Sequence, residues 1–142
     1  MTGRSFGAAR QSTYMSREIV SSGTEWEAHV GYSRAVAVDG QVHVSGTTPV
    51  DDDGEVLGDS PYEQTKAALD IVARALEEAG ASLSDVVRTR MYVTDIDDYE
   101  AVGRAHGEVF ADVRPAATMV EVSRLVDEDF CVEIEATAVL SD

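Results

Sequence analysis

The segment from Ser60 to Gly80 carries the strongest structural signal in the chain, that of one long amphipathic helix with both ends marked. Ser60 can accept hydrogen bonds from the first free backbone N–H groups, Pro61 suits the first helical position, and Glu63 completes a capping box. Gly80 is typical of the residue that follows a helix. Apolar residues recur between these ends at helical spacing, at Ala68, Ile71, Val72, Ala75, Leu76 and Ala79. Because only one face of such a helix is apolar, we expect it to pack against a second layer.

Strand patterns precede this helix. Residues 17–24 can form a short strand, and two β-favouring runs follow at 35–38 and 41–45. The Asp39-Gly40 dipeptide between these two runs predicts a hairpin, because both central positions of the turn need a positive φ. We therefore expect three strands ahead of the helix, two of them paired through this turn.

The pattern after the helix is strand, helix and two further strands. Residues 85–95 read as a half-covered strand. One side of this strand, expected to be buried, consists of Val87, Thr89, Met91 and Val93. The other side consists of Arg88, Arg90 and Tyr92. Asp97 and Glu100 predict the start of a second helix. The apolar face of that helix is formed by Tyr99, Val102, His106, Val109 and Phe110. The last two strands are expected within residues 117–125 and 131–140.

The order of these elements, β, ββ, α, β, α, ββ, predicts an α+β fold in which two helices pack on one face of a mixed sheet. Residues 1–16 carry no such pattern and are expected to be loose, so that residues 17–142 form a single domain. One domain also suits a length of 142 residues.

The charge of the chain is strongly negative, which restricts its partners. Twenty-seven Asp and Glu residues face 11 Lys and Arg residues, for a net charge of −16, and Lys66 is the only lysine. This charge repels phosphate backbones and argues against nucleic acid as a partner. An acid-rich, lysine-poor surface would suit a protein adapted to a very salty cytoplasm, although an ordinary soluble acidic protein would look the same.

Several other classes are disfavoured by the composition. No apolar run approaches the roughly 20 residues of a membrane span, and residues 1–20 lack the apolar core of a secretory signal, so we expect a cytoplasmic protein with no membrane partner. Cys131 is the only cysteine, which excludes an intrachain disulfide and favours a small buried hydrophobe. The histidines at 29, 43 and 106 have no metal-ligand spacing. His106 is expected to be a hydrogen-bonded core residue, and the other two to be exposed.

Seven short blocks resemble, in order and spacing, the Rid (YjgF-like) family of enamine and imine deaminases. The blocks are Tyr32-Ser33 with Ala35-Val36, "VSG" at 44–46 followed by Pro49, Gln64-Thr65, "LSDVVRTRMYVTD" at 83–95, "DYEAV" at 98–102, "PAATMVEV" at 115–122 and "VEIEA" at 132–136. The resemblance extends from Tyr32 to Val139, which is most of the chain.

The resemblance implies a chorismate-mutase-like α+β subunit that assembles as a homotrimer, with the sheets forming a central barrel, the helices outside and three clefts between subunits. It also implies a small-molecule substrate, a 2-iminoalkanoate or its enamine, which arises as a reactive by-product of pyridoxal-phosphate enzymes. Water adds to the imine carbon and ammonia leaves, giving a 2-oxo acid. No metal and no organic cofactor are implied.

One departure from the family pattern falls on the residue that binds the substrate. Deaminating members have Pro-Ala-Arg here, and the planar, always charged fork of that arginine holds the substrate carboxylate. Ala117 occupies this position and cannot bind a carboxylate, so the usual 2-iminoalkanoate substrates lose their anchor. Arg114 could reach back as a displaced anchor, or its side chain could lie beyond the turn. Thr118 could offer a hydroxyl group to the site.

The other family site residues are retained. Glu133 matches the glutamate thought to orient the attacking water; with Glu135 on the same strand face, it could equally belong to a pair of carboxylates turned to solvent or to a trimer channel. Tyr32 matches a tyrosine that lines the pocket, and Ser45-Gly46 match the segment whose main chain contacts the ligand. Gly46 could also be the small residue that a strand end needs.

The segment ahead of Tyr32 departs from the family pattern as well. Deaminating members usually have Gly-Pro before the Tyr-Ser pair, whereas residues 25–31 read "EWEAHVG". We expect a surface loop here, with Trp26 and His29 as candidate rim residues.

These observations favour a trimeric small-molecule hydrolase that acts on an imine, an enamine or a related C=N substrate. The alternative is a non-catalytic trimer that binds a metabolite in the same clefts, as a regulatory protein would. A third activity, endoribonuclease or translation inhibitor, is attached to some relatives by name. The net charge of −16 and the lack of a basic patch with interleaved aromatic residues oppose it.

Overall fold

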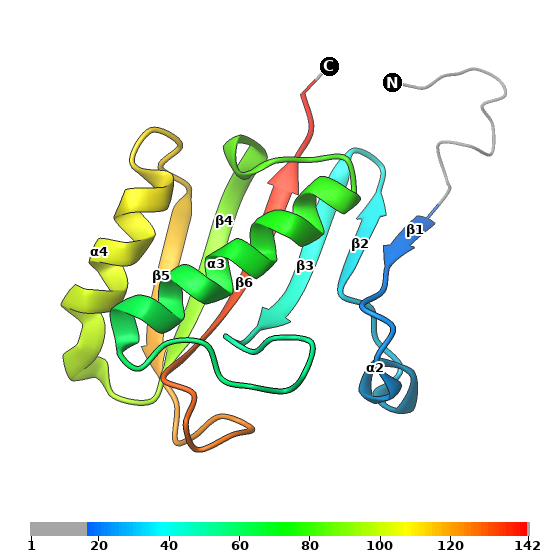
Figure 1. The fold of residues 1–142 in the computed structure, drawn as a ribbon. Coiled ribbons are helices and arrows are strands. Elements are labelled where there is room, and N and C mark those ends of the chain that lie inside the picture. Colours follow the sequence, from blue (N-terminus) through cyan, green and yellow to red (C-terminus); the bar gives the residue numbers. More distant parts are fainter. Residues whose placement is uncertain (1–16, 142) are drawn as a thin grey trace, which may run out of the picture.

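A mixed sheet forms the framework of the part of the chain that the structure describes, residues 17–141 of a computed structural model (Figure 1). Its strands lie in the order β1-β2-β3-β6-β4-β5. Every neighbouring pair is antiparallel except β4 and β5, which are parallel. The strand bounds are β1 Arg17–Val20, β2 Ala35–Val38, β3 Gln41–Thr47, β4 Val86–Val93, β5 Ala116–Glu121 and β6 Val132–Val139. The segment expected to be loose, residues 1–16, lies outside the described residues.

Two long helices, α3 (Pro61–Glu78) and α4 (Tyr99–Phe110), lie side by side across one face of the sheet (Figure 1). This arrangement confirms the predicted α+β architecture with both helices on one face. A short helix, α2 (Glu25–Val30), lies apart from them, beyond the ends of β1 and β2 (Figure 1). Short 3-10 turns at Leu83–Asp85 and Ile96–Asp98 lead into β4 and α4.

The start of α3 is capped by Ser60 as predicted, but Glu63 reaches the residue before Ser60 and does not close the predicted capping box. The Ser60 side chain accepts a hydrogen bond from the Glu63 N–H at 3.2 Å, and the Glu63 carboxylate accepts one from the Asp59 N–H at 2.8 Å. The apolar side of α3 packs on β3 and β6. The fully buried core beneath it includes Val42, Ala68, Leu69, Val72, Leu76, Val132 and Ile134. The helix is therefore held both by its cap and by burial of one face.

The two faces of the sheet differ in character. In β6 the even-numbered residues from Val132 to Ala138 are buried beneath the helices. Side chains alternate along a strand, so Glu133, Glu135 and Thr137 lie on the opposite face, which we call the helix-free face.

The hairpin between β2 and β3 forms as predicted. Asp39 and Gly40 have φ angles of 56° and 80°, and Val38 pairs with Gln41 across the turn. Both turn residues thus adopt the left-handed conformation that this two-residue loop requires.

The predicted alternation of β4 is wrong at its first residues. Val87, expected on the buried side, is 46% exposed, whereas Val86 is 3% exposed. The pairing of β4 with β6 shifts register between Val86 and Arg88, and this irregularity moves the buried position back by one residue. From Thr89 to Val93 the alternation is as predicted.

The predicted start of the second helix is also wrong, by one residue. Asp97 does not cap α4; instead its N–H donates to the Asp95 side chain at 2.9 Å within a 3-10 turn, and α4 begins at Tyr99. A short acidic side chain can bond locally to the backbone two residues on, and this local bond takes the place of a helix cap.

The expected loop at residues 25–31 is in fact the helix α2. Thr24 caps it by accepting a hydrogen bond from the Glu27 N–H at 3.3 Å, and Gly31 ends it with a φ of 89°. The Glu27 carboxylate is 4% exposed and accepts hydrogen bonds from the Ser21 and Ser22 hydroxyl groups. The Thr24-x-x-Glu27 spacing was the available signal, but six residues carry no helical periodicity by themselves.

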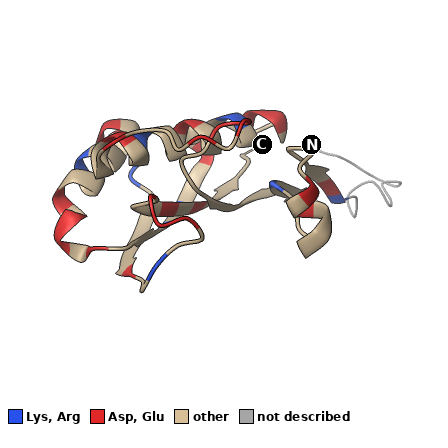
Figure 2. Cartoon of the chain, turned by 60° about the horizontal axis from the view of Figure 1, so that its bottom comes forward, with Lys and Arg blue, Asp and Glu red and all other residues tan. Residues whose placement is uncertain are grey.

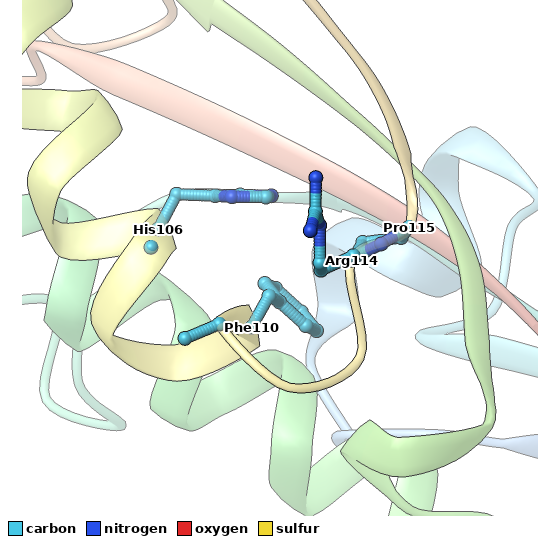
Figure 3. Close-up of a pocket in the computed structure, with 6 residues that line it drawn as sticks. His106, Phe110, Arg114 and Pro115 are labelled. Carbon is cyan, nitrogen blue, oxygen red and sulfur yellow. The ribbon is translucent and has the colours of Figure 1, made fainter.

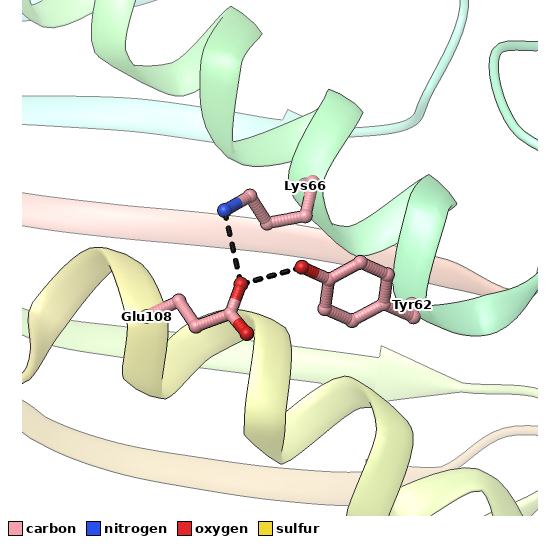
Figure 4. Close-up of polar contacts among 3 residues, drawn as sticks. All are labelled: Tyr62, Lys66 and Glu108. Atoms are coloured by element: carbon pink, nitrogen blue, oxygen red, sulfur yellow. Dashed lines mark hydrogen bonds and ion pairs between the residues drawn. The ribbon is translucent and has the colours of Figure 1, made fainter.

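The two long helices are joined by polar contacts on their outer surface (Figure 4). Glu108 of α4 accepts hydrogen bonds from the Tyr62 hydroxyl at 2.5 Å and from the Lys66 ammonium group at 3.3 Å. The Arg104 guanidinium lies 4.1 Å from the centre of the Tyr62 ring. The hydrogen bond from Tyr62 and the one from Lys66 lower the pKa of Glu108. These contacts help to fix α4, which carries one wall of a pocket described below.

Candidate functional site

Glu133 lies beside an irregular part of β3. Regular pairing of β3 with β6 breaks between Val44 and Thr47, so Ser45 and Gly46 form a bulge next to Glu133. A Cβ atom added at Gly46 would lie 2.4 Å from the Glu133 carboxylate oxygen Oε2. The carboxylate therefore rests against the Gly46 main chain, in space that a larger residue would fill.

Arg34, which the sequence analysis missed, adds a positive charge to this group. Its guanidinium Nη2 donates to the Gly46 carbonyl oxygen at 2.7 Å. Its Nε is buried and has no hydrogen-bond partner among the described residues. The signal that could have found it is an arginine placed directly before Ala35, where a buried strand begins.

Hydrogen bonds tie the segment that starts at Tyr32 to the bulge. The Ser45 hydroxyl donates to the Ser33 carbonyl oxygen at 2.6 Å, and the Ser45 N–H donates to the Arg34 carbonyl oxygen at 3.0 Å. Tyr32 lies one residue earlier, is 36% exposed, and donates its N–H to the Glu27 carbonyl oxygen of α2 at 3.0 Å. We call Arg34, Ser45, Gly46 and Glu133 the Glu133 cluster.

Glu133 and Glu135 lie on the same face of the sheet but have different partners. Burial raises the pKa of Glu133 above its ordinary value of 4.5; the positive charge of Arg34 opposes this shift, and the charge of Glu135 adds to it. Glu135 instead forms an ion pair with Arg90 at 3.2 Å. The half-buried Glu133 thus holds its proton more tightly than an exposed glutamate does, as many general acids and bases do.

A second feature, a pocket of about 410 Å³, lies at the C-terminal end of α4 (Figure 3). We call it the Arg114 pocket; its lining residues are His106, Gly107, Phe110, Ala111, Arg114 and Pro115. Figure 3 shows the Arg114 guanidinium rising beside the His106 ring. The Arg114 side chain is thus turned toward α4.

His106 forms a fixed wall of this pocket. Its Nε2 is 2.9 Å from the Thr89 Oγ1, and its ring centroid lies 4.7 Å from that of Phe110. Burial lowers the pKa of His106 below its ordinary value of 6.5, so the imidazole is neutral at neutral pH. The predicted hydrogen-bonded role of His106 is confirmed, although the ring is only half-buried and borders a pocket.

Ala117 and Thr118 lie on β5, at the edge of the sheet, and face opposite sides. Ala117 pairs with Thr89, so it lies on the helix side, next to the wall formed by His106. Thr118 lies on the helix-free face and accepts a hydrogen bond from the Arg88 guanidinium at 3.0 Å. Both side chains are exposed.

The site residues expected from the sequence thus form two groups within one chain. Glu133 lies on β6 and Ala117 on β5, with β4 between them, which separates the strands by about 10 Å. The two side chains also lie on opposite faces of the sheet. A single chain brings together Ser45, Gly46 and Glu133, and it keeps the region of Arg114 and Ala117 apart from them.

Comparison with known proteins assigns the family. A family model described as Endoribonuclease L-PSP matches residues 22–140, most of the chain. The chain belongs to this YjgF-like family. A crystal structure of a member of the YjgF/YER057c/UK114 family from Mycobacterium tuberculosis is 48% identical, with a TM-score of 0.81, and the alignment covers 88% of this chain and 100% of that one.

Curated relatives of the YjgF-like chain include one with a named activity. The 3-aminoacrylate deaminase RutC of Acinetobacter baylyi is 36% identical over 109 residues, which covers 75% of this chain and 85% of the relative. An uncharacterised protein of Streptomyces coelicolor is 40% identical over 119 residues, covering 84% and 89%. No helix in residues 17–141 is long and apolar enough to cross a membrane.

Proposed function

We propose that this YjgF-like protein hydrolyses the C=N bond of a small imine or enamine. The observation that carries the proposal is the Glu133 cluster, in which a half-buried carboxyl group with a raised pKa rests against the Gly46 main chain beside a guanidinium. The deaminase activity named for the Acinetobacter relative supports the same reaction class.

The reaction needs a group that moves a proton between water and nitrogen. The oxygen of water bonds to the imine carbon while the electron pair of the C=N π bond moves to nitrogen. The Glu133 carboxylate takes a proton from that water and passes it to nitrogen, which gives a carbinolamine. It then takes the proton of the new hydroxyl group and passes it to the amine nitrogen as the C–N bond breaks. Ammonia leaves and a C=O bond forms, so atoms and charges balance with water alone.

The working site is proposed to lie between subunits of a homotrimer. In one chain the Glu133 cluster and the Arg114 pocket lie on opposite faces of the sheet, with a strand between their strands. A cleft formed by two copies would bring the Glu133 cluster of one copy to the Arg114 pocket of the next. The assembly would thus complete a site that one chain holds in two parts.

An RNA substrate is disfavoured by the charge of the molecule. The chain has a net charge of −16, and Figure 2 shows acidic residues spread over helices and loops with few basic residues among them. Phosphate backbones would be repelled from such a surface. The description of the matched family as an endoribonuclease therefore does not extend to the activity proposed here.

The direct test is hydrolysis of imines generated in place by an amino acid oxidase, with semicarbazide present to trap the imine that escapes the enzyme. We expect the wild-type protein to release ammonia and to lower semicarbazone formation. Glu133→Gln keeps the shape of the side chain but removes the acid, and should reduce kcat by at least about 100-fold. Absence of turnover with every imine tested, from a folded wild-type protein, would reject the proposal in favour of a non-catalytic metabolite-binding trimer.

A further inference from the structure

We propose that Arg114 binds the carboxylate of the substrate, taking the role of the arginine that is absent at position 117. The substrates would then be small imino acids or their enamines, with a negative charge, and not neutral imines. This inference rests on the proposed function and names the substrate class of the same site.

The pocket contains a free cation. The Arg114 side chain is exposed and forms no hydrogen bond or ion pair with any of residues 17–141, whose ion pairs are Lys66–Glu108 and Arg90–Glu135. All five N–H donors of its planar fork therefore remain available, and a carboxylate can accept two of them at once. A volume of about 410 Å³ suits a small molecule rather than a chain segment.

The backbone at Arg114 has an uncommon conformation. Its φ is 56°, in the left-handed region that glycine adopts more easily, and its N–H donates to the Phe110 carbonyl oxygen at 2.8 Å. Pro115 follows and restricts the next step of the chain. These constraints fix the main chain from which the Arg114 side chain extends beside His106, as Figure 3 shows, and a strained residue at a pocket is a common mark of a binding site.

The other walls of the pocket suit an uncharged part of the ligand. His106 is neutral, and its Nε2 is engaged with Thr89, while the Phe110 and Pro115 rings supply apolar surface. No Asp or Glu lines the pocket. No carboxylate of the pocket lining therefore opposes the positive charge of Arg114, which favours an anionic ligand.

Positions 114 and 117 both lie near His106, which forms a wall of the Arg114 pocket. Ala117 pairs with Thr89, and Thr89 is hydrogen-bonded to His106, the wall beside which the Arg114 guanidinium lies. A small side chain at 117 leaves room for a guanidinium that comes from position 114 instead. An arginine at position 114 or at position 117 can therefore place its guanidinium group at the β5 edge of the sheet.

The test measures kcat/KM for 2-iminopropionate and for its uncharged primary amide, in the wild-type protein and in Arg114→Ala. We expect the variant to lose about 100-fold on the anionic substrate and little on the amide, because one charge-assisted contact is removed. Arg74→Ala is the matched control, since Arg74 lies exposed on α3 and far along the chain from the pocket; it should keep the wild-type preference.

Two further variants separate a binding role from a structural one. Arg114→Lys keeps the charge without the fork and should lose about tenfold on 2-iminopropionate. Arg114→Ala combined with Ala117→Arg should recover part of the preference for the anion, which no loss of folding could produce. Equal preference for the anion in wild type and Arg114→Ala would overturn the inference.

A binding measurement keeps this test independent of catalysis. Pyruvate, the product of 2-iminopropionate hydrolysis, is titrated calorimetrically into each variant. Binding that is lost in Arg114→Ala and regained in the double variant supports the carboxylate site even if no imine is turned over, in which case only the proposed reaction fails. Unchanged pyruvate affinity in Arg114→Ala rejects the site whether or not imines are hydrolysed.

Discussion

The Glu133 cluster and the Arg114 pocket hold their charged groups in different ways. In the cluster, Arg34 donates to a main-chain carbonyl group and Glu133 is half-buried in the middle of the sheet. In the pocket, Arg114 is exposed on a turn at the sheet edge and has no partner among residues 17–141. The proposed chemistry thus depends on rigid central strands, whereas the proposed choice of substrate depends on an edge where a change such as an alanine at 117 disturbs little packing.

The largest effect is expected when a methyl group is added to the cluster. In Gly46→Ala the new Cβ would lie 2.4 Å from Glu133 Oε2, so the carboxyl group must move. We expect about a 100-fold loss of kcat/KM, because displacement of a catalytic group by about 1 Å has this cost. Steady-state kinetics measures it, and circular dichroism checks that the fold is retained. Wild-type kinetics in this variant would show that the position of Glu133 is unimportant.

Removal of the cluster's cation should have a smaller effect. Arg34→Gln takes away the positive charge that lowers the pKa of Glu133, so this pKa should rise further and less of the base form is present at a given pH. We expect about a tenfold loss of kcat below the new pKa, with the rising limb of the pH–rate profile moved to higher pH. A profile with an unmoved limb would contradict a role for Arg34 in setting this proton affinity.

A glycine-to-alanine substitution in the pocket, Gly107→Ala, should be favourable, because it should raise the stability of the protein. A Cβ atom at Gly107 meets nothing within 4 Å, and the residue lies inside α4. Gly107→Ala should stabilise the protein by about 0.5–1 kcal/mol through helix propensity. Urea denaturation measures this change, and destabilisation would mean that the pocket is more tightly packed than its open walls indicate.

The smallest effect concerns stability against pH. The folded-state pKa of Glu133 is raised, so the folded chain binds more protons than the unfolded chain between the ordinary value of 4.5 and the raised value. The free energy of unfolding of the wild type should therefore fall as pH increases through this window, relative to Glu133→Gln. Denaturation of both proteins over a pH series tests the sign. A wild-type curve that rises relative to the variant would contradict burial as the cause of the shift.

Elements with local signals were predictable from the sequence. The capped helix from Pro61 and the hairpin at Asp39-Gly40 depend on residues that lie within a few positions of one another, and both formed as expected. The Glu133 cluster was predicted in part, since Ser45, Gly46 and Glu133 proved to be neighbours. Arg34 was missed because its partner, the Gly46 carbonyl group, lies 12 residues away across the sheet.

By itself, the sequence determined the two long helices, the strands around them, the family and the alanine at position 117. The tertiary structure alone decided that Val86 and not Val87 is buried, that the site residues divide between two faces, and that Arg114 turns toward His106. The physical reason is that strand register and the direction of a side chain after a turn depend on pairing between distant strands. Local propensity carries no information about that pairing.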